Sequence, residues 1–238
     1  MEYAEARHQL LLHGPGTTDA AGQPLVVEDG FLGSLRPYSG LHEENFHIVM
    51  EALLSVGERV HQSPQIDREL MYAAWSICHT ARGWGLAPGG MLQRNRLITT
   101  ADAARLERWV GTLEIVALRL LRGWTPHHAV YHYAEYVVEV GWWDNVAFFV
   151  GLMGRAVSDP EVSDAIETIA QALGKIGPLA KAAIPALREA EGREYTWYTP
   201  ADRCTEEVRA HIRRASKQSS VERPRRRPRN FFLSCDGR

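Results

Sequence analysis

The stretch that decides the fold is DPEVSDAIETIAQALGKIGPLAKAAIPALREA, residues 159–190. Apolar residues recur in its first half at i, i+4, i+7 and i+11, on one face of a helix: Val162, Ile166, Ile169 and Leu173. A second stripe follows around the Gly177-Pro178 break: Ile176, Ala180, Ala183, Ile184 and Leu187. The short link predicts two helices that turn back on each other, and we expect Pro185 to bend the second.

These residues resemble the HEAT repeat family in its short bacterial form. The resemblance covers residues 159–190 only and rests on Asp159, Val162, Ala172-Leu173-Gly174, Ile176-Gly177-Pro178, Ala180 and Ala183-Ile184-Pro185-Ala186-Leu187. It implies an all-α protein, an irregular α-α solenoid of antiparallel helix pairs that bury their faces by stacking on neighbours. Such families are mostly protein-binding scaffolds, and the resemblance carries no catalytic residue onto these positions.

Helical periodicity also extends over most of the remaining chain. Five pairs of a capping residue or glycine with proline mark helix starts: Ser63-Pro64, Thr125-Pro126, Asp159-Pro160, Gly177-Pro178 and Thr199-Pro200. The pattern predicts helices at about 41–61, 64–83, 100–122, 126–140, 143–157, 160–174, 178–190 and 200–216. It therefore predicts an irregular N-terminal segment (1–40), a helical-repeat domain (41–216) and a basic tail (217–238) that we expect to be disordered.

The charge is unevenly distributed along the 238 residues. The net charge is −2 at pH 7, but residues 1–216 hold 20 Lys/Arg against 27 Asp/Glu, a net of −7. An acidic body argues against nucleic-acid binding by the folded part. Nucleic acid is therefore not an expected partner, and a solvated tail is favoured; only the tail arginines could contact nucleic acid: Arg223, Arg225, Arg226, Arg227 and Arg229.

The three cysteines and the most apolar segment bear on location. Cys78, Cys204 and Cys235 are far apart and lack a CxxC spacing, so they predict neither a disulfide framework nor a zinc site. The stretch VVEVGWWDNVAFFVGLMG contains Glu139 and Asp144 and is too short and too charged to span a bilayer. We therefore expect a cytoplasmic protein without membrane contact.

One candidate metal site lies on the helix predicted at 126–140. His128, His132, Glu135 and Glu139 fall at i, i+4, i+7 and i+11 and share a helix face. Two imidazoles at i and i+4 present nitrogen ligands on one side, and Glu135 could add an oxygen. The alternative is a solvated polar stripe opposite a buried face, and this alternative is favoured because a spacing match alone is unspecific.

Two further chemical patterns are less specific. Glu44-x-x-His47 has the spacing used by di-iron carboxylate bundles, with Glu114 as a possible extra ligand, but the pattern occurs once where such sites need two copies. Cys78 adjoins His79, yet adjacent residues of a helix point about 100° apart, so the pair does not form a nucleophile with its base. Cys78 falls on the apolar face of its predicted helix, with Trp75, and is therefore predicted to lie in the core.

Trp142 and Trp143 follow Gly141 at a predicted helix–helix corner. They are expected either to pack between helices or to form an exposed anchor for a protein partner, because Trp dominates interface hot spots. Together the patterns predict no cofactor and favour a non-catalytic, protein-binding helical-repeat scaffold. Within that class, the most concrete expectation is an immunity or antitoxin type that masks a toxin. The alternative is a metal-dependent helical-bundle enzyme that uses His128, His132 and Glu135.

Overall fold

The computed structural model describes residues 1–18, 24–25, 28–63, 65–142, 146–158, 165–193 and 201–220. Over these residues the protein is all-α, apart from a two-residue antiparallel pair of β1 (Thr17–Thr18) with β2 (Pro24–Leu25). The longer helices are α1 (Tyr3–His13), α2 (Glu43–Gln62), α3 (Arg68–Ala81), α5 (Thr100–Leu121), α7 (Tyr131–Val140), α8 (Val146–Ser158), α9 (Ala165–Ile176), α10 (Ile184–Glu191) and α11 (Ala201–Ser220). Short turns of helix join them: η1 (Arg82–Leu86), α4 (Met91–Arg94), α6 (Pro126–Ala129) and η3 (Gly177–Ala183).

The first forty residues are not irregular as predicted, because Tyr3–His13 forms α1. Ala6, Leu10 and Leu11 are buried where α1 packs on α2, and Arg7 pairs with Asp67 at 2.8 Å near the start of α3. The sequence shows only a three-leucine run here, so the periodic signal is weak. The helix is stabilised by docking on α2, and local propensity alone does not specify it.

The start of the next helix is also corrected. Ser63-Pro64 predicted a start at residue 64, whereas α3 begins at Arg68. The Asp67 side chain accepts hydrogen bonds from the backbone N–H groups of Glu69 and Leu70, which satisfies two donors of the first turn. A capping carboxylate with two acceptor bonds therefore determines where α3 begins.

The opening stretch forms the predicted helical turn-back with two differences. Gly177 adopts a φ of +72°, which favours glycine, and the next residues form the 3-10 helix η3 before α10. Pro185 consequently lies in the first turn of α10 and does not bend a longer helix. Asp159 and Val162, on which part of the HEAT resemblance rests, lie outside the described residues.

At its C-terminal end, α11 continues to Ser220, so residues 217–220 belong to a helix and not to the tail predicted from 217. Val208, Ile212, Ala215 and Ser219 continue one buried stripe at i, i+4, i+7 and i+11, and this stripe carries the helix past residue 216. Residues 221–238, including the five tail arginines, lie outside the described residues.

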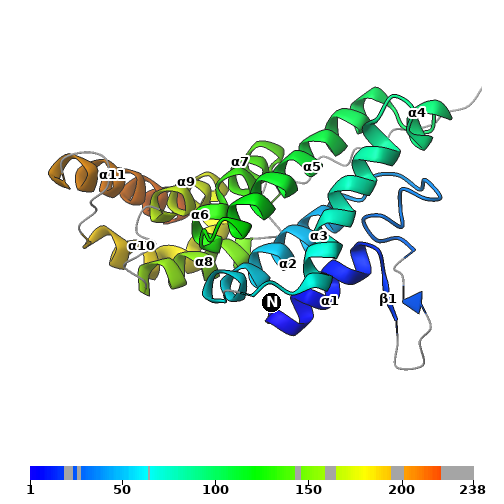
Figure 1. The fold of residues 1–238 in the computed structure, drawn as a ribbon. Coiled ribbons are helices and arrows are strands. Elements are labelled where there is room, and N and C mark those ends of the chain that lie inside the picture. The colour runs from blue at the N-terminus through cyan, green and yellow to red at the C-terminus, as the bar shows by residue number, and fades with distance from the viewer. Residues whose placement is uncertain are drawn as a thin grey trace, which may run out of the picture.

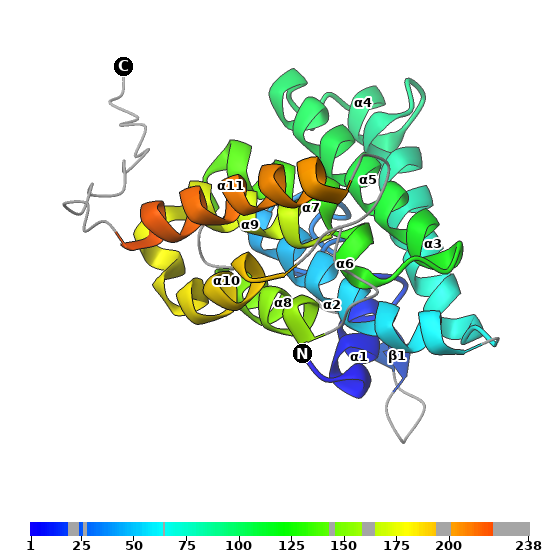
Figure 2. The ribbon, with the colours of Figure 1, turned by 90° about the vertical axis from the view of Figure 1, so that its left-hand side faces the viewer.

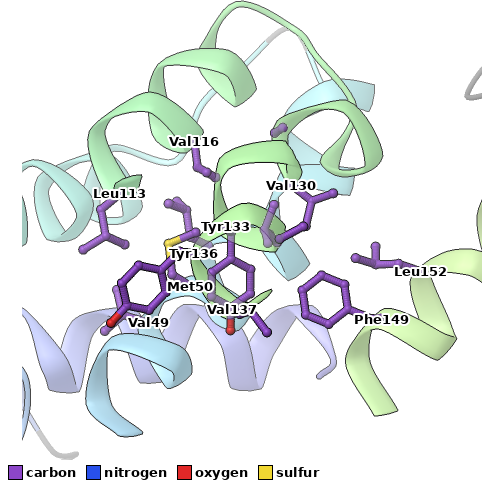
Figure 3. Close-up of a cluster of buried hydrophobic side chains, with 14 of the residues drawn as sticks. Val49, Met50, Leu113, Val116, Val130, Tyr133, Tyr136, Val137, Phe149 and Leu152 are labelled. Carbon is purple, nitrogen blue, oxygen red and sulfur yellow. The ribbon is translucent and has the colours of Figure 1, made fainter. Parts of the chain in front are cut away.

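The centre of the core lies where α2, α5, α7 and α8 meet. Figure 3 shows Met50 of α2, Val116 of α5, Tyr133 of α7 and Phe149 of α8 pointing into one cluster. The rings of Tyr133 and Phe149 stack at 5.8 Å, and those of Phe46 and Trp109 at 5.3 Å. Aromatic packing of this kind stabilises the contact beyond the area that the rings bury, and it ties α2 to α5 and α7 to α8 within this core.

The helices follow one another from one end of the molecule to the other (Figures 1 and 2). At one end α1 packs on α2 and α3, and α5 packs on α2. At the other end α9 contacts α7, α8 and α11, and α10 contacts α11. Within the described ranges, no helix combines the length and the apolar content that crossing a membrane requires.

Candidate functional site

Large apolar side chains are exposed together on the outer sides of α3 and α5. On α3, Tyr72 is 61% exposed and Trp75 is 66% exposed. On α5 the exposed apolar side chains are Ile115, Leu118 and Leu121, with Leu118 at 56%. Single exposed apolar residues are ordinary, whereas a group of them on two neighbouring helices is typical of a candidate interaction site.

Between these two helices lies a groove of about 350 Å³. Its floor is formed by Leu53, Val56 and Val60 of α2. Its walls come from α3 and α5: Leu70, Met71, Ala74, Trp75, Cys78, Ala117, Leu118, Leu120 and Leu121. Mostly apolar clefts with a few polar groups, starting near 300 Å³, are typical binding sites in proteins.

The groove forms because α5 is apolar over more of its surface than its neighbours cover. Leu106, Leu113 and Leu120 are buried against the rest of the molecule. Ile115 and Leu118 lie on another face of α5 and stay exposed. Because the apolar stripe of α5 is wider than the surface that the neighbouring helices cover, part of it remains exposed.

One end of the groove is closed by an ion pair. The Arg82 guanidinium donates to both carboxylate oxygens of Glu114, at 3.1 Å from Nε and 2.6 Å from the terminal nitrogen, and so joins α3 to α5. Glu114 is thereby engaged in an ion pair and is not placed as a metal ligand. On the α3 wall, the Trp75 ring stacks on His79 at 5.7 Å, which holds the indole against its own helix.

Cys78 lies in the groove wall as a buried thiol, as its position on the apolar face of the helix predicted. Burial, with a further contribution from the Glu114 carboxylate, raises the pKa of the thiol to about 12. The thiol is therefore protonated at neutral pH and is a poor nucleophile. The groove therefore suits the binding of apolar groups, and Cys78 does not act in it as an activated nucleophile.

A second cluster joins α2, α5 and α7 through buried polar groups. The Tyr136 hydroxyl donates to the Glu43 carboxylate at 2.6 Å and accepts from the Trp109 indole N–H at 2.6 Å. The His47 Nδ1 lies 2.9 Å from the Tyr133 hydroxyl, and its Nε2 lies 3.8 Å from Glu43. The adjacent His47 imidazole and the hydrogen bond from Tyr136 hold the pKa of Glu43 below its usual range.

This cluster corrects the expected pairing of Glu44 with His47. Glu44 is exposed, whereas His47 is buried and faces Glu43, four residues earlier on α2. Trp142 stacks on the His47 ring at 4.5 Å with an interplanar angle of 13°, so the packing alternative describes this tryptophan. Trp143 lies outside the described residues.

The polar face of α6 and α7 is engaged in contacts with neighbouring side chains. His132 Nε2 lies 3.2 Å from an Arg119 guanidinium nitrogen, and its Nδ1 lies 3.1 Å from Glu135. The guanidinium can only donate, so it occupies the lone pair of Nε2 that a metal would need. His128 Nδ1 lies 2.7 Å from the Thr125 hydroxyl. Within the described part of the chain, no three His, Cys, Asp or Glu side chains converge on one point.

Sequence reasoning missed the groove, although a signal for it exists. Tyr72, Trp75 and His79 fall at i, i+3 and i+7 of α3, and Ile115 and Leu118 at i and i+3 of α5. Such second stripes on helices that already have a buried stripe would have indicated uncovered apolar surface. Comparison of the chain with protein-family models, with curated proteins and with solved structures finds no match.

Proposed function

We propose that this chain is a protein-binding helical-repeat scaffold whose groove between α3 and α5 holds a helix of a partner protein. The observation that carries the proposal is the exposure of Trp75 and Leu118, at 66% and 56%, on either side of an apolar hollow. Trp and Tyr are enriched among the residues that dominate binding energy at interfaces. Desolvating such side chains is the main favourable term in association.

The shape of the groove suits a helix. Helices α3 and α5 run antiparallel (Figure 1), and the groove extends along α3 from Leu70 to Arg82. Twelve residues of helix rise about 18 Å, which is the length of about three turns. An amphipathic helix with apolar residues at i, i+3 or i+4, and i+7 would place one row of side chains in the hollow. The ion pair between Arg82 and Glu114 sets one limit of this row.

A second copy of this chain suits the groove less well. In a two-fold symmetric dimer the same surface meets itself. Two grooves would then face each other across the axis and leave a void, and unfilled apolar space costs stability. Trp75 does not project as a complementary ridge, because its ring is stacked on His79 of the same helix.

Within this class, we propose a solenoid of HEAT-like type that masks a toxin, as an immunity or antitoxin protein does. The sequential packing of α7, α8, α9, α10 and α11 on their neighbours supports the repeat architecture. The net charge of −7 over residues 1–216 supports a basic partner surface, because opposite charges steer association. The coding neighbourhood tests this finer proposal: the product of an adjacent gene should be toxic alone and harmless with this chain.

The groove itself is tested with a display library of amphipathic helical peptides of about three turns, selected on the full chain. Enriched peptides should carry large apolar residues at i, i+3 or i+4, and i+7. Their Kd should rise at least about tenfold for Leu118→Glu, because a charge then faces the apolar row. The matched control is Leu179→Glu, since Leu179 is 59% exposed but lies on η3, and it should leave Kd unchanged.

Two outcomes would contradict the proposal. In one, the selected peptides bind Leu118→Glu as tightly as the wild type, which would place their site elsewhere. In the other, analytical ultracentrifugation shows a wild-type dimer that Leu118→Glu dissociates, which would make a second copy the occupant of the groove.

A further inference from the structure

Helices α9 and α11 approach each other unusually closely because small residues meet at their contact. A Cβ atom added to Gly174 would lie 3.0 Å from the Ala215 Cα and 2.8 Å from the Gln218 side-chain oxygen. A Cβ at this position would require α11 to shift at Ala215, so glycine permits the close approach. The outer edge of the contact therefore has a floor of small residues, Ala170, Gly174 and Ala215, between two rows of longer side chains.

Above this floor lies a hollow of about 250 Å³ with a polar rim. The rim is formed by Gln171 and Lys175 of α9 and by His211, Arg214 and Gln218 of α11. Each of these side chains can donate a hydrogen bond, Lys175 and Arg214 carry permanent positive charge, and no carboxylate lines the hollow. The volume lies just below that of drug-sized ligand sites and suits a single anionic group such as a phosphate.

The two cations of the rim differ from the basic residues that are already neutralised by a carboxylate. Arg7, Arg82 and Arg108 each pair with a carboxylate. Lys175 and Arg214 are exposed and have no carboxylate partner among the described residues. Glu167 of α9 accepts a hydrogen bond from the Gln171 amide at 3.0 Å, and its Oε1 lies 2.7 Å from the His211 Nδ1, so these two rim side chains already have a partner. The charges of Lys175 and Arg214 are therefore available to an external anion.

The hollow is lined by α11, and the sequence is basic from the start of this helix onward. Residues 201–238 contain 11 Lys/Arg and 5 Asp/Glu, a net of +6, whereas residues 1–200 contain 16 and 24, a net of −8. On α11, Arg213, Arg214 and Lys217 are exposed, and the chain continues into the arginines at 223–229. The exposed cations of α11 attract a polyanion, whereas the net negative charge of residues 1–200 repels it. Figure 2 shows the last turns of α11 at the edge of the molecule, where such a ligand can approach.

We propose that the hollow between α9 and α11 binds a backbone phosphate of a single-stranded nucleic acid, which continues along the exposed side of α11. The cations of α11, with Lys175 of α9 beside them, match one phosphate backbone, and the Gln218 amide of the rim can supply a hydrogen bond. An anionic membrane suits this surface less well, because interfacial binding needs apolar side chains that insert. Of the described residues after 146, only Leu179 is a large exposed apolar side chain.

The test measures the binding of the full chain to a fluorescent oligodeoxythymidylate of about 20 nucleotides by anisotropy, over about 50 to 200 mM KCl. The double variant K175Q/R214Q should weaken binding at least about tenfold. It should also reduce the slope of log K against log[salt] by about 1.4, because each lost phosphate contact contributes about 0.7 for single strands. The matched control is K181Q/R188Q, which removes two exposed charges from η3 and α10 and should change Kd less than about twofold.

Four results would overturn the proposal. Wild-type protein without salt-dependent binding would remove its basis. Equal weakening by the two double variants would reduce the effect to net charge. Loss of binding in R225Q/R226Q/R227Q with full binding by K175Q/R214Q would assign the site to the tail alone. Binding to phosphatidylserine vesicles without binding to the oligonucleotide would identify a membrane surface as the ligand. All variants should first show the wild-type melting temperature.

Discussion

The first 142 residues and the described residues from 146 onward distribute their side chains in opposite ways. Every exposed large apolar side chain of the described residues except Leu179 lies in the first part. The buried histidines, His13, His47 and His127, lie there too. In the second part, alanine, isoleucine and leucine fill the interior, and the exposed side of α11 carries cations.

The two parts differ in whether neighbouring helices cover the apolar side chains of each helix. In α9, α10 and α11 each apolar stripe is covered by the neighbouring helix, so local pattern and tertiary contact agree. In α3 and α5 the apolar surface exceeds its cover, and in α2 a histidine is buried in a polar cluster. Departures from simple patterning of this kind concentrate at functional sites, which is why the groove is the preferred site.

The largest expected effect tests whether the second part is a packed core. Ile169→Ala and Leu187→Ala should each lower the free energy of unfolding by about 2–5 kcal/mol, because both side chains are fully buried. Leu118→Ala, on the exposed face of α5, should cost less than about 0.5 kcal/mol. Urea melts measure all three. Losses below about 0.5 kcal/mol at both buried positions would show that the stripe of α9 and α10 does not face a core.

The second effect tests the buried histidines of the first part. His13 Nδ1 accepts a hydrogen bond from the Phe31 N–H at 3.2 Å, which requires a neutral ring, and burial lowers the pKa of His13 to about 4. As pH falls below about 6.5 the unfolded chain binds a proton that the folded chain does not. The free energy of unfolding should therefore fall by up to about 3 kcal/mol between pH 7 and pH 4.

The variant His13→Gln keeps an acceptor for Phe31 but does not titrate. Its free energy of unfolding should depend less on pH than that of the wild type, and the difference between the two curves isolates His13 from the other titrating groups. Parallel curves between pH 7 and pH 4 would mean that His13 is protonated equally in the folded and unfolded chains.

The third effect compares two glycines in helices of the two parts. Gly174→Val should destabilise by about 1–3 kcal/mol, because the new side chain would overlap Ala215 of α11. Gly111→Ala should stabilise by about 0.5–1 kcal/mol, because no atom lies within 4 Å of the added Cβ in α5. If Gly174→Val is neutral in thermal melts, α9 and α11 do not approach as closely as described.

The smallest effect concerns the polar face of α6 and α7. The double change of His128→Ala with His132→Ala should alter the free energy of unfolding by no more than about 0.5 kcal/mol, since both rings lie at the surface edge of the fold. Elemental analysis of the purified protein should find no stoichiometric zinc, iron or manganese. One metal ion per chain that disappears in the double variant would favour the enzyme alternative over the scaffold.

Much of the helical content follows from the sequence alone because its causes are local. The 3.6-residue period predicted α2 and α5 to within about two residues, and Thr125-Pro126 marked the start of α6. It also indicated the helices that became α7–α11, although α10 begins only at Ile184, after the 3-10 helix η3. The same period indicated that Cys78 is buried, and burial is what the structure shows. Caps and apolar stripes act within one or two turns, so they can be recognised without knowing which helices become neighbours.

Tertiary contacts decided the remaining features, because each depends on residues far apart in the sequence. Docking on α2 makes a helix of residues 3–13 despite a weak local pattern. The burial of His47 depends on Tyr133, 86 residues later. The groove exists because no described helix covers the outer faces of α3 and α5. An apolar stripe specifies that a residue prefers to be covered, but only the packing of the whole chain determines whether a neighbour covers it.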